Sequence, residues 1–116
     1  MRRTALVTGA AQGLGAHIAQ ALHIAGYNIV VSDVDADAAI DFAAALDPAA
    51  ETAVGIALDV RQSSAFEAAL AEMTVRWGRA DVLVNNAVVT AVKPVLDIGP
   101  DEFDAVMAVN VRGTFI

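Results

Sequence analysis

The sequence lacks cysteine, has few aromatic residues and carries no excess of positive charge. Without cysteine, disulfides and thiolate chemistry are excluded. The basic start, Met1 to Arg3, is followed by Gly9 and Gln12 too soon for the apolar core of a secretory signal. No apolar run approaches the roughly 18 residues that a membrane span needs. We therefore expect a cytoplasmic protein that does not engage a membrane.

The formal net charge is −7, and the acidic residues are spread along the chain. A polyanion would be repelled by such a surface, so we do not expect nucleic acid as a partner. A ligand that carries phosphate groups would have to be held by backbone N–H groups, because no basic patch is available to hold it.

The 116 residues have the length of one domain, and the apolar pattern predicts alternating strands and helices. Short β-branched runs predict strands at residues 5–7, 29–31, 54–58 and 82–84. Helical spacing predicts helices at residues 14–25, 37–46 and 64–77 and from about Pro100 onward, the third opened by a capping box from Ser64 to Glu67. This order predicts one α/β domain over residues 1–116, a Rossmann-like, doubly wound parallel sheet with helices on both faces.

A glycine-rich stretch, Thr8 to Gly15, lies at the first strand-to-helix junction. Glycines at such a junction let the backbone turn sharply and approach a pyrophosphate, whose charge meets the N–H groups at the helix N-terminus. An acid, Asp33, ends the second predicted strand 18 residues after Gly15. Glycine also serves ordinary turns, but this context favours a dinucleotide site.

The spacing of the glycines is G-x-x-x-G-x-G rather than G-x-G-x-x-G. Together with Asn85-Asn86-Ala87, Leu58-Asp59-Val60 and the stretch from Val109 to Gly113, it resembles the short-chain dehydrogenase/reductase family. The resemblance covers essentially all 116 residues, as the N-terminal half of a typical member. It implies the strand order 3-2-1-4 and a nicotinamide dinucleotide as cofactor.

The resemblance also implies which residues contact the cofactor: Gly9, Gln12, Gly13, Leu14, Gly15, Asp33, Asp59, Val60, Asn86 and Ala87. Asp33 is placed to bond both hydroxyls of the adenosine ribose and to repel a 2′-phosphate. Because Gln12 and Val34 occupy the positions where a basic residue would accept that phosphate, we expect NAD rather than NADP. Asp59 has an equally good alternative role as an acid that opens a loop. Val88 stands where the family normally has glycine, which would narrow the nicotinamide side.

Asn110 shares a predicted helical stripe with Phe103 and Val106, so we expect it to be buried and to have hydrogen-bond partners. In the family that the chain resembles, the matching Asn belongs to a catalytic tetrad with Ser, Tyr and Lys, and it helps hold a water in a proton relay. The alternative is an Asn that only fixes the helix to the sheet, and the two roles are compatible.

The rest of that tetrad is absent, because the only tyrosine is Tyr27 and the only lysine is Lys93. We expect the chain to be truncated within its fourth helix, before the Ser and the Tyr-x-x-x-Lys pair. The resemblance implies an NAD-dependent oxidoreductase that transfers hydride between the cofactor and a small alcohol or carbonyl substrate. The alternatives are a dinucleotide-binding fragment or binding module without chemistry, and a regulatory sensor on the same fold.

The expected order leaves the fourth strand as an open edge beside apolar surface, which predicts a homo-oligomer or partial disorder after about Pro100. No metal is expected. The stretch from Asp33 to Asp37 resembles a calcium loop, but Ala38 and Ala44 replace the required Gly and Glu. His17 and His23 have no further ligands nearby in sequence, so we expect surface or boundary roles for both.

Overall fold

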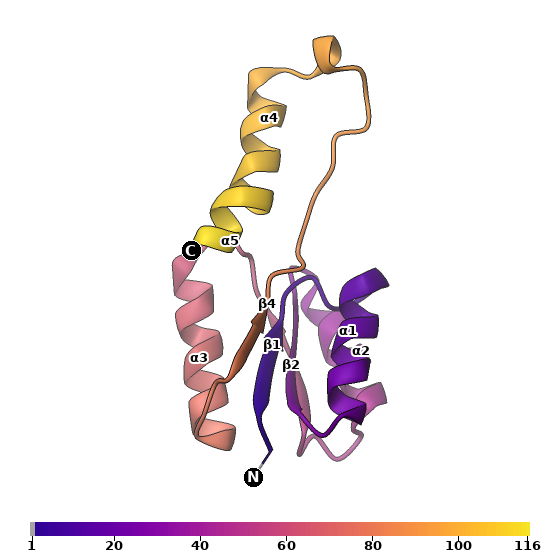
Figure 1. The fold of residues 1–116 in the computed structure, drawn as a ribbon, viewed down its shortest axis with the longest axis vertical. Helices are drawn as coiled ribbons and strands as arrows, with labels where there is room; N and C mark the ends of the chain where they lie inside the picture. The colour runs from indigo at the N-terminus through magenta and orange to yellow at the C-terminus, as the bar shows by residue number, and fades with distance from the viewer. Residues whose placement is uncertain (1) are drawn as a thin grey trace.

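The computed structural model describes residues 2–116, which form a four-stranded parallel sheet with helices on both faces (Figure 1). The strands are β1 (Thr4–Val7), β2 (Asn28–Asp33), β3 (Ala53–Ala57) and β4 (Val82–Val84). Their order in the sheet is β3-β2-β1-β4, and every neighbouring pair is parallel. The predicted α/β class and strand order are confirmed.

Two helices cover one face of the sheet and a third covers the other (Figure 1). Helices α1 (Gly13–Ile24) and α2 (Ala36–Leu46) pack on the side chains of Val7, Ile29 and Val31. Helix α3 (Ser63–Trp77) packs on Leu6, Val30 and Val54, which alternate along β1, β2 and β3 with the residues that face α1 and α2.

The predicted capping box of the third helix is wrong. Gln62 occupies the N-cap position of α3 without a side-chain capping hydrogen bond, and Ser64 lies inside the first turn. The helix starts early because the preceding turn closes early, with the Gln62 N–H donating to the Asp59 carbonyl at 3.0 Å.

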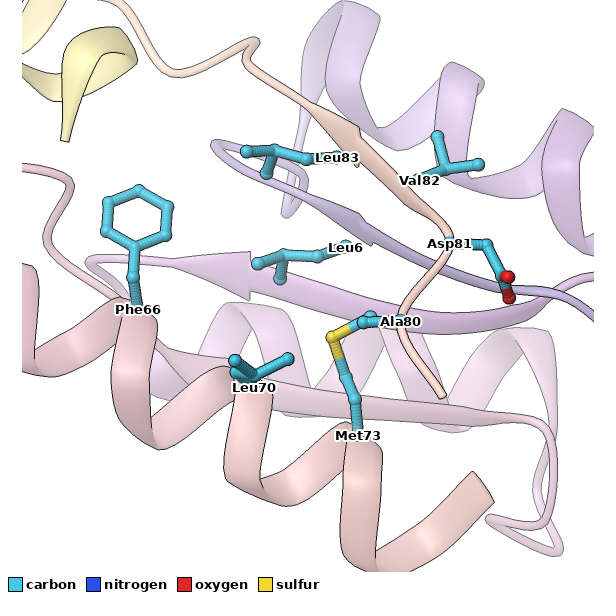
Figure 2. A pocket seen from close by; sticks show the side chains of 8 residues that line it. All are labelled: Leu6, Phe66, Leu70, Met73, Ala80, Asp81, Val82 and Leu83. Atoms are coloured by element: carbon cyan, nitrogen blue, oxygen red, sulfur yellow. The ribbon is translucent and has the colours of Figure 1, made fainter. Parts of the chain in front are cut away.

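Strand β4 is an open edge, because among residues 2–116 it pairs with β1 alone. On the α3 face, Leu6 and Leu83 of the sheet lie opposite Leu70 and Met73 of the helix, across a hollow of about 250 Å³ (Figure 2). Leu83 is 50% exposed. The predicted open edge beside apolar surface is confirmed.

After β4 the chain leaves the sheet as an arm, which we define as residues 85–116; residues 2–84 are the body. The arm is first extended, with a 3-10 turn at Val95–Asp97, and then helical through α4 (Pro100–Met107), a π-helical turn (Ala108–Arg112) and α5 (Gly113–Phe115). Its end returns to lie beside the first turn of α3 (Figure 1). Residues 100–115 are therefore helical, and the homo-oligomer or partial disorder expected there stays a prediction.

Within residues 2–116, every helix is too short or too polar to cross a lipid bilayer.

Candidate functional site

Four parallel strands end at one edge of the sheet, and the residues predicted to form the site follow these ends. The glycine loop follows β1, Asp33 ends β2, Asp59 and Val60 follow β3, and Asn86 and Ala87 follow β4. Open parallel sheets bind ligands at this carboxyl edge, at the point where strand order reverses. Here the reversal falls between β1 and β4.

The glycine loop is joined to the end of β4 through Thr8 and Asn86. The Thr8 hydroxyl accepts hydrogen bonds from the backbone N–H groups of Asn86 and Ala87, each at 3.0 Å, and donates to the Val84 carbonyl at 3.3 Å. The Asn86 amide donates to the carbonyls of Thr8 at 3.0 Å and Gly9 at 3.1 Å. No role was assigned to Thr8 from the sequence. The feature that could have indicated one is a hydroxyl residue at the end of an apolar strand, directly before the first glycine.

Two glycines of the loop, Gly15 and Gly13, serve different purposes. A Cβ on Gly15 would lie 2.5 Å from the Gly9 carbonyl oxygen and would collide with the Asn86 amide, so this glycine permits close packing of the loop. Gly13 has φ +61°, which favours glycine, but a Cβ there would meet nothing within 4 Å. The outer side of the loop at Gly13 is therefore open to a ligand, whereas the inner side is filled by the protein.

The open side of the loop leads to the first turn of α1. Gln12 precedes the helix, and no side chain among residues 2–116 caps this end. The N–H groups of an uncapped first turn attract an anion. Leu14, 70% exposed, stands in the same turn.

Asp33 is half-buried at the end of β2, and its carboxylate is fixed against the glycine loop. One oxygen accepts from the Ala11 N–H at 3.2 Å and the other from the Asp35 N–H at 3.1 Å. A carboxylate can accept about four hydrogen bonds, so Asp33 retains capacity for donors from a ligand. Gln12 and Val34 both lie exposed.

Asp59 is already engaged by a neighbour. Its carboxylate forms an ion pair with Arg61 at 2.6 Å and accepts from the Arg61 backbone N–H at 2.9 Å. The hydrogen bond from the Arg61 side chain is the main reason why the pKa of Asp59 lies below its usual value. This geometry favours the role of Asp59 as an acid that opens the loop over a role as a hydrogen-bond acceptor for adenine. Val60, beside it, is buried against Gly113.

Asn110 lies in the π-helical turn of the arm, and both ends of its amide are satisfied by one residue. Its Oδ1 accepts from the Val89 N–H at 2.9 Å, and its Nδ2 donates to the Val89 carbonyl at 2.8 Å. The expectation of hydrogen-bond partners is confirmed. The expectation of a buried stripe is wrong, because Asn110 is only half-buried and Phe103 is 57% exposed. The amide therefore fixes the helix to the segment that follows β4.

The structure does not bring Tyr27 and Lys93 together. Tyr27 directly precedes β2 and therefore lies at the amino end of the strands, opposite the candidate site. Lys93 lies on the arm, where it pairs with Glu102 at 2.6 Å. His17 bonds the Gly13 carbonyl and His23 bonds Thr52, each at 2.8 Å. Residues 2–116 contain no cluster of side chains suited to a metal ion.

This fold and this edge define a doubly wound α/β protein with a glycine loop of the dinucleotide-binding kind. A family model for short chain dehydrogenases matches residues 3–116. The chain belongs to that family of oxidoreductases.

Individual relatives agree with this assignment. Sorbitol dehydrogenase of Cereibacter sphaeroides is 38% identical over 112 residues, which are 97% of this chain and 43% of that protein. D-threitol dehydrogenase of Mycolicibacterium smegmatis is 37% identical over 114 residues, 98% of this chain and 44% of that protein. The chain thus spans less than half the length of these relatives.

Solved structures share the fold closely. A 3-ketoacyl-(acyl-carrier-protein) reductase from Brucella melitensis, in complex with NADH, superposes with a TM-score of 0.89 at 31% identity and covers 97% of this chain and 46% of its own. A glucose/ribitol dehydrogenase of the same family and organism gives a TM-score of 0.91 at 30% identity, covering 99% and 51%.

Proposed function

We propose that the chain is the dinucleotide-binding part of an NAD-dependent oxidoreductase, which transfers hydride between the nicotinamide and an alcohol or carbonyl carbon. The observation that carries this proposal is the Asp33 carboxylate fixed against the glycine loop beside an uncapped helix N-terminus. The dehydrogenase relatives and the reductase solved with NADH support the class of reaction and the class of cofactor.

In this proposal residues 1–116 act as one binding domain. The pyrophosphate lies against the open side of Gly13 and the N–H groups of the first turn of α1. Asp33 accepts hydrogen bonds from the ribose hydroxyls, and Val60 borders the adenine. Ala87 and Asn86 border the nicotinamide side, and Asn110 holds Val89 beside them. When bound, the nicotinamide supplies the hydride; the residues of this chain bind and orient it.

The choice of NAD over NADP is tested by the two dissociation constants, measured by calorimetry. We expect NAD to bind at least about tenfold more tightly, because a 2′-phosphate would face the Asp33 carboxylate and no side chain at Gln12 or Val34 could neutralise it. Asp33→Ser should weaken NAD binding by about 10- to 100-fold, the range for a hydrogen bond to a charged group. Asp37→Ser, an exposed acid of α2, is the matched control. Tighter binding of NADP to the unaltered chain would overturn the choice.

An alternative is that the 116-residue chain binds the dinucleotide without turnover. The observation that favours it is the separation of Tyr27 from Lys93, which leaves no Tyr–Lys pair to protonate a substrate oxygen. An assay of NADH oxidation with carbonyl substrates, run on this chain beside a chain extended through a further strand and helix, distinguishes the two. Turnover by the extended chain supports the enzyme, and NAD binding without turnover by both chains supports the binding module.

We also propose that this chain forms a homo-oligomer through the open edge of strand β4. Unpaired strand groups and the half-exposed Leu83 favour pairing with a second copy. Sedimentation velocity should show dimers or larger species, and Leu83→Lys should shift the population toward monomer because a charge blunts the edge. Val75→Lys, on the exposed side of α3, is the control. A compact monomer at all concentrations would contradict the proposal.

A further inference from the structure

The turn that carries Asn110 contacts two parts of the candidate site at once. On one side Asn110 holds Val89, three residues after Asn86. On the other side the next residues of the turn contact the loop from Asp59 to Arg61, where the adenine is proposed to bind. Arg112 and Gly113, which make this second group of contacts, are residues to which the family resemblance gave no role.

Arg112 provides the first of these contacts. Its Nη1 donates to the Arg61 backbone carbonyl at 3.0 Å, across 51 positions of sequence. The Arg61 guanidinium in turn donates hydrogen bonds to both oxygens of the Asp59 carboxylate. The position of Arg112 is thus tied directly to the conformation of the Asp59–Arg61 loop.

Gly113 provides the second contact and is the only buried residue of the arm. A Cβ at this position would lie 2.6 Å from Val60 Cγ2 and 3.0 Å from Val60 Cβ. Distances this short are not tolerated between carbon atoms, so any side chain would push the turn away from Val60. Glycine therefore sets how closely the helix approaches the loop.

The π-helical geometry links these contacts to Asn110. Residues 108–112 form the π turn, and the N–H of Gly113 bonds the Ala108 carbonyl. Within one such turn Asn110, Arg112 and Gly113 point to different neighbours. Asn110 and Arg112 both lie between the two residues that this hydrogen bond joins.

We propose that Arg112 and Gly113 are positioning residues that couple the adenine subsite to the placement of Asn110. This inference rests on the proposed function, in that it requires adenine to bind at the Asp59–Arg61 loop. A nucleotide that orders this loop stabilises the Asn110–Val89 pair, and by linkage the pair strengthens nucleotide binding by the same factor. The adenine half of the cofactor thereby helps to assemble the nicotinamide half of the site.

The experiment measures hydrogen exchange of the Val89 amide by NMR in the 116-residue chain, with AMP as the probe. AMP carries the adenosine half alone, so it tests transmission and not direct contact with the nicotinamide side. We expect AMP to slow Val89 exchange by about fivefold or more in the unaltered chain, the lower range of typical coupling. In Arg112→Ala and Gly113→Ala the exchange should already be faster without ligand, and AMP should change it less than about twofold.

Matched controls separate positioning from general destabilisation. Arg76→Ala removes an exposed arginine that pairs with Glu72 on α3, and Gly99→Ala adds a methyl group where a Cβ has open space. Both should leave Val89 exchange and its response to AMP unchanged. Arg112→Lys retains a donor for the Arg61 carbonyl and should restore part of the response.

Reciprocity supplies a second readout. Asn110→Ala should weaken AMP binding by about the factor by which AMP slows Val89 exchange, although Asn110 is not placed to touch AMP. Equal responses of Val89 to AMP in the unaltered chain and in Arg112→Ala would overturn the coupling. If AMP and NAD give no heat of binding at all, the proposed function fails as well. Unchanged exchange in the ligand-free variants would instead overturn the positioning role alone.

Discussion

The body and the arm are held in place by different forces. In the body, Val7, Ile29 and Val31 are completely buried between the sheet and two helices. The arm has one buried residue, Gly113, and several large apolar side chains are exposed along it, among them Val92 at 93%, Leu96 at 95% and Phe115 at 88%. The glycine loop and Asp33 thus belong to a packed core, whereas Asn110 belongs to a segment held by polar contacts and by the apolar contacts of Ala87, Val109 and Gly113 with the body.

This difference teaches where rigidity in the site originates. Elements with many buried apolar contacts open only with the whole domain, and elements with few such contacts open locally at lower cost. The half of the site proposed for the phosphates and ribose is therefore formed in advance. The half that carries Asn110 depends on its bonds to Val89 and on the approach of Gly113 to Val60.

Substitution in the core should have the largest effect on stability. Ile29→Ala, in the central strand β2, should lower the free energy of unfolding by about 3 kcal/mol, because it removes buried methyl groups and leaves a cavity. Phe103→Ala, on the exposed face of α4, should change it by less than about 0.5 kcal/mol. Urea denaturation followed by far-UV circular dichroism measures both. Comparable losses would show that the arm is packed as firmly as the body.

The fold could be predicted because its signals are local. Short β-branched runs such as the one around Val30 gave the strands, and the Ala-rich patterns gave helices that approach the sheet closely through Ala39 and Ala43. The start of α3 could not be predicted, because Ser64 and Glu67 have the correct spacing for a cap. The turn in which the Gln62 N–H donates to the Asp59 backbone carbonyl closes earlier, and the helix starts at Ser63.

The candidate site was predictable only in part, for a similar reason. The spacing of the glycines and Asp33 is visible along the chain, and the hydrogen bond from Ala11 to Asp33 accords with it. The predicted Asn110 stripe assumed 3.6 residues per turn. The π turn at residues 108–112 breaks that period at Asn110, whereas Phe103 is exposed within the regular helix α4. Contacts between residues far apart in the sequence, such as the hydrogen bond from Arg112 to the Arg61 carbonyl, cannot be predicted from residue spacing.

Removing the Asn110 amide should release the arm without unfolding the body. Asn110→Ala deletes two hydrogen bonds to Val89, each contributing about 1 kcal/mol. We expect protease cleavage within residues 88–99 to become about 30-fold faster, since local opening there costs about 2 kcal/mol less. Limited proteolysis with mass spectrometry identifies the cut positions.

The control for this substitution is Asn85→Ala, which removes an exposed amide at the end of β4. It should leave the cleavage rate as it is in the unaltered chain. Equal rates for Asn110→Ala and the unaltered chain would mean that other contacts hold the arm.

The smallest expected effect is an acid-dependent one, confined to the body. Asp47, which follows α2, accepts hydrogen bonds from the Thr52 hydroxyl and the Thr52 N–H, each at 2.8 Å, and from the N–H of Glu51 at 3.0 Å. These bonds, the Thr52 hydroxyl first, lower the pKa of Asp47 from 3.8 to about 2. A lowered pKa in the folded state means that the carboxylate stabilises the fold above about pH 4, and that this contribution is lost as the pH falls toward 2. The difference in unfolding free energy between the unaltered chain and Asp47→Asn should therefore be present at pH 6 and shrink between pH 4 and pH 2. Urea denaturation at a series of pH values measures it.

The same variant also tests whether the body and the arm are independent. Asp47 lies between α2 and β3, at the amino end of the strands and away from the arm, so Asp47→Asn should leave cleavage within residues 88–99 unchanged at pH 6. A change in that cleavage would show that the body and the arm are not independent.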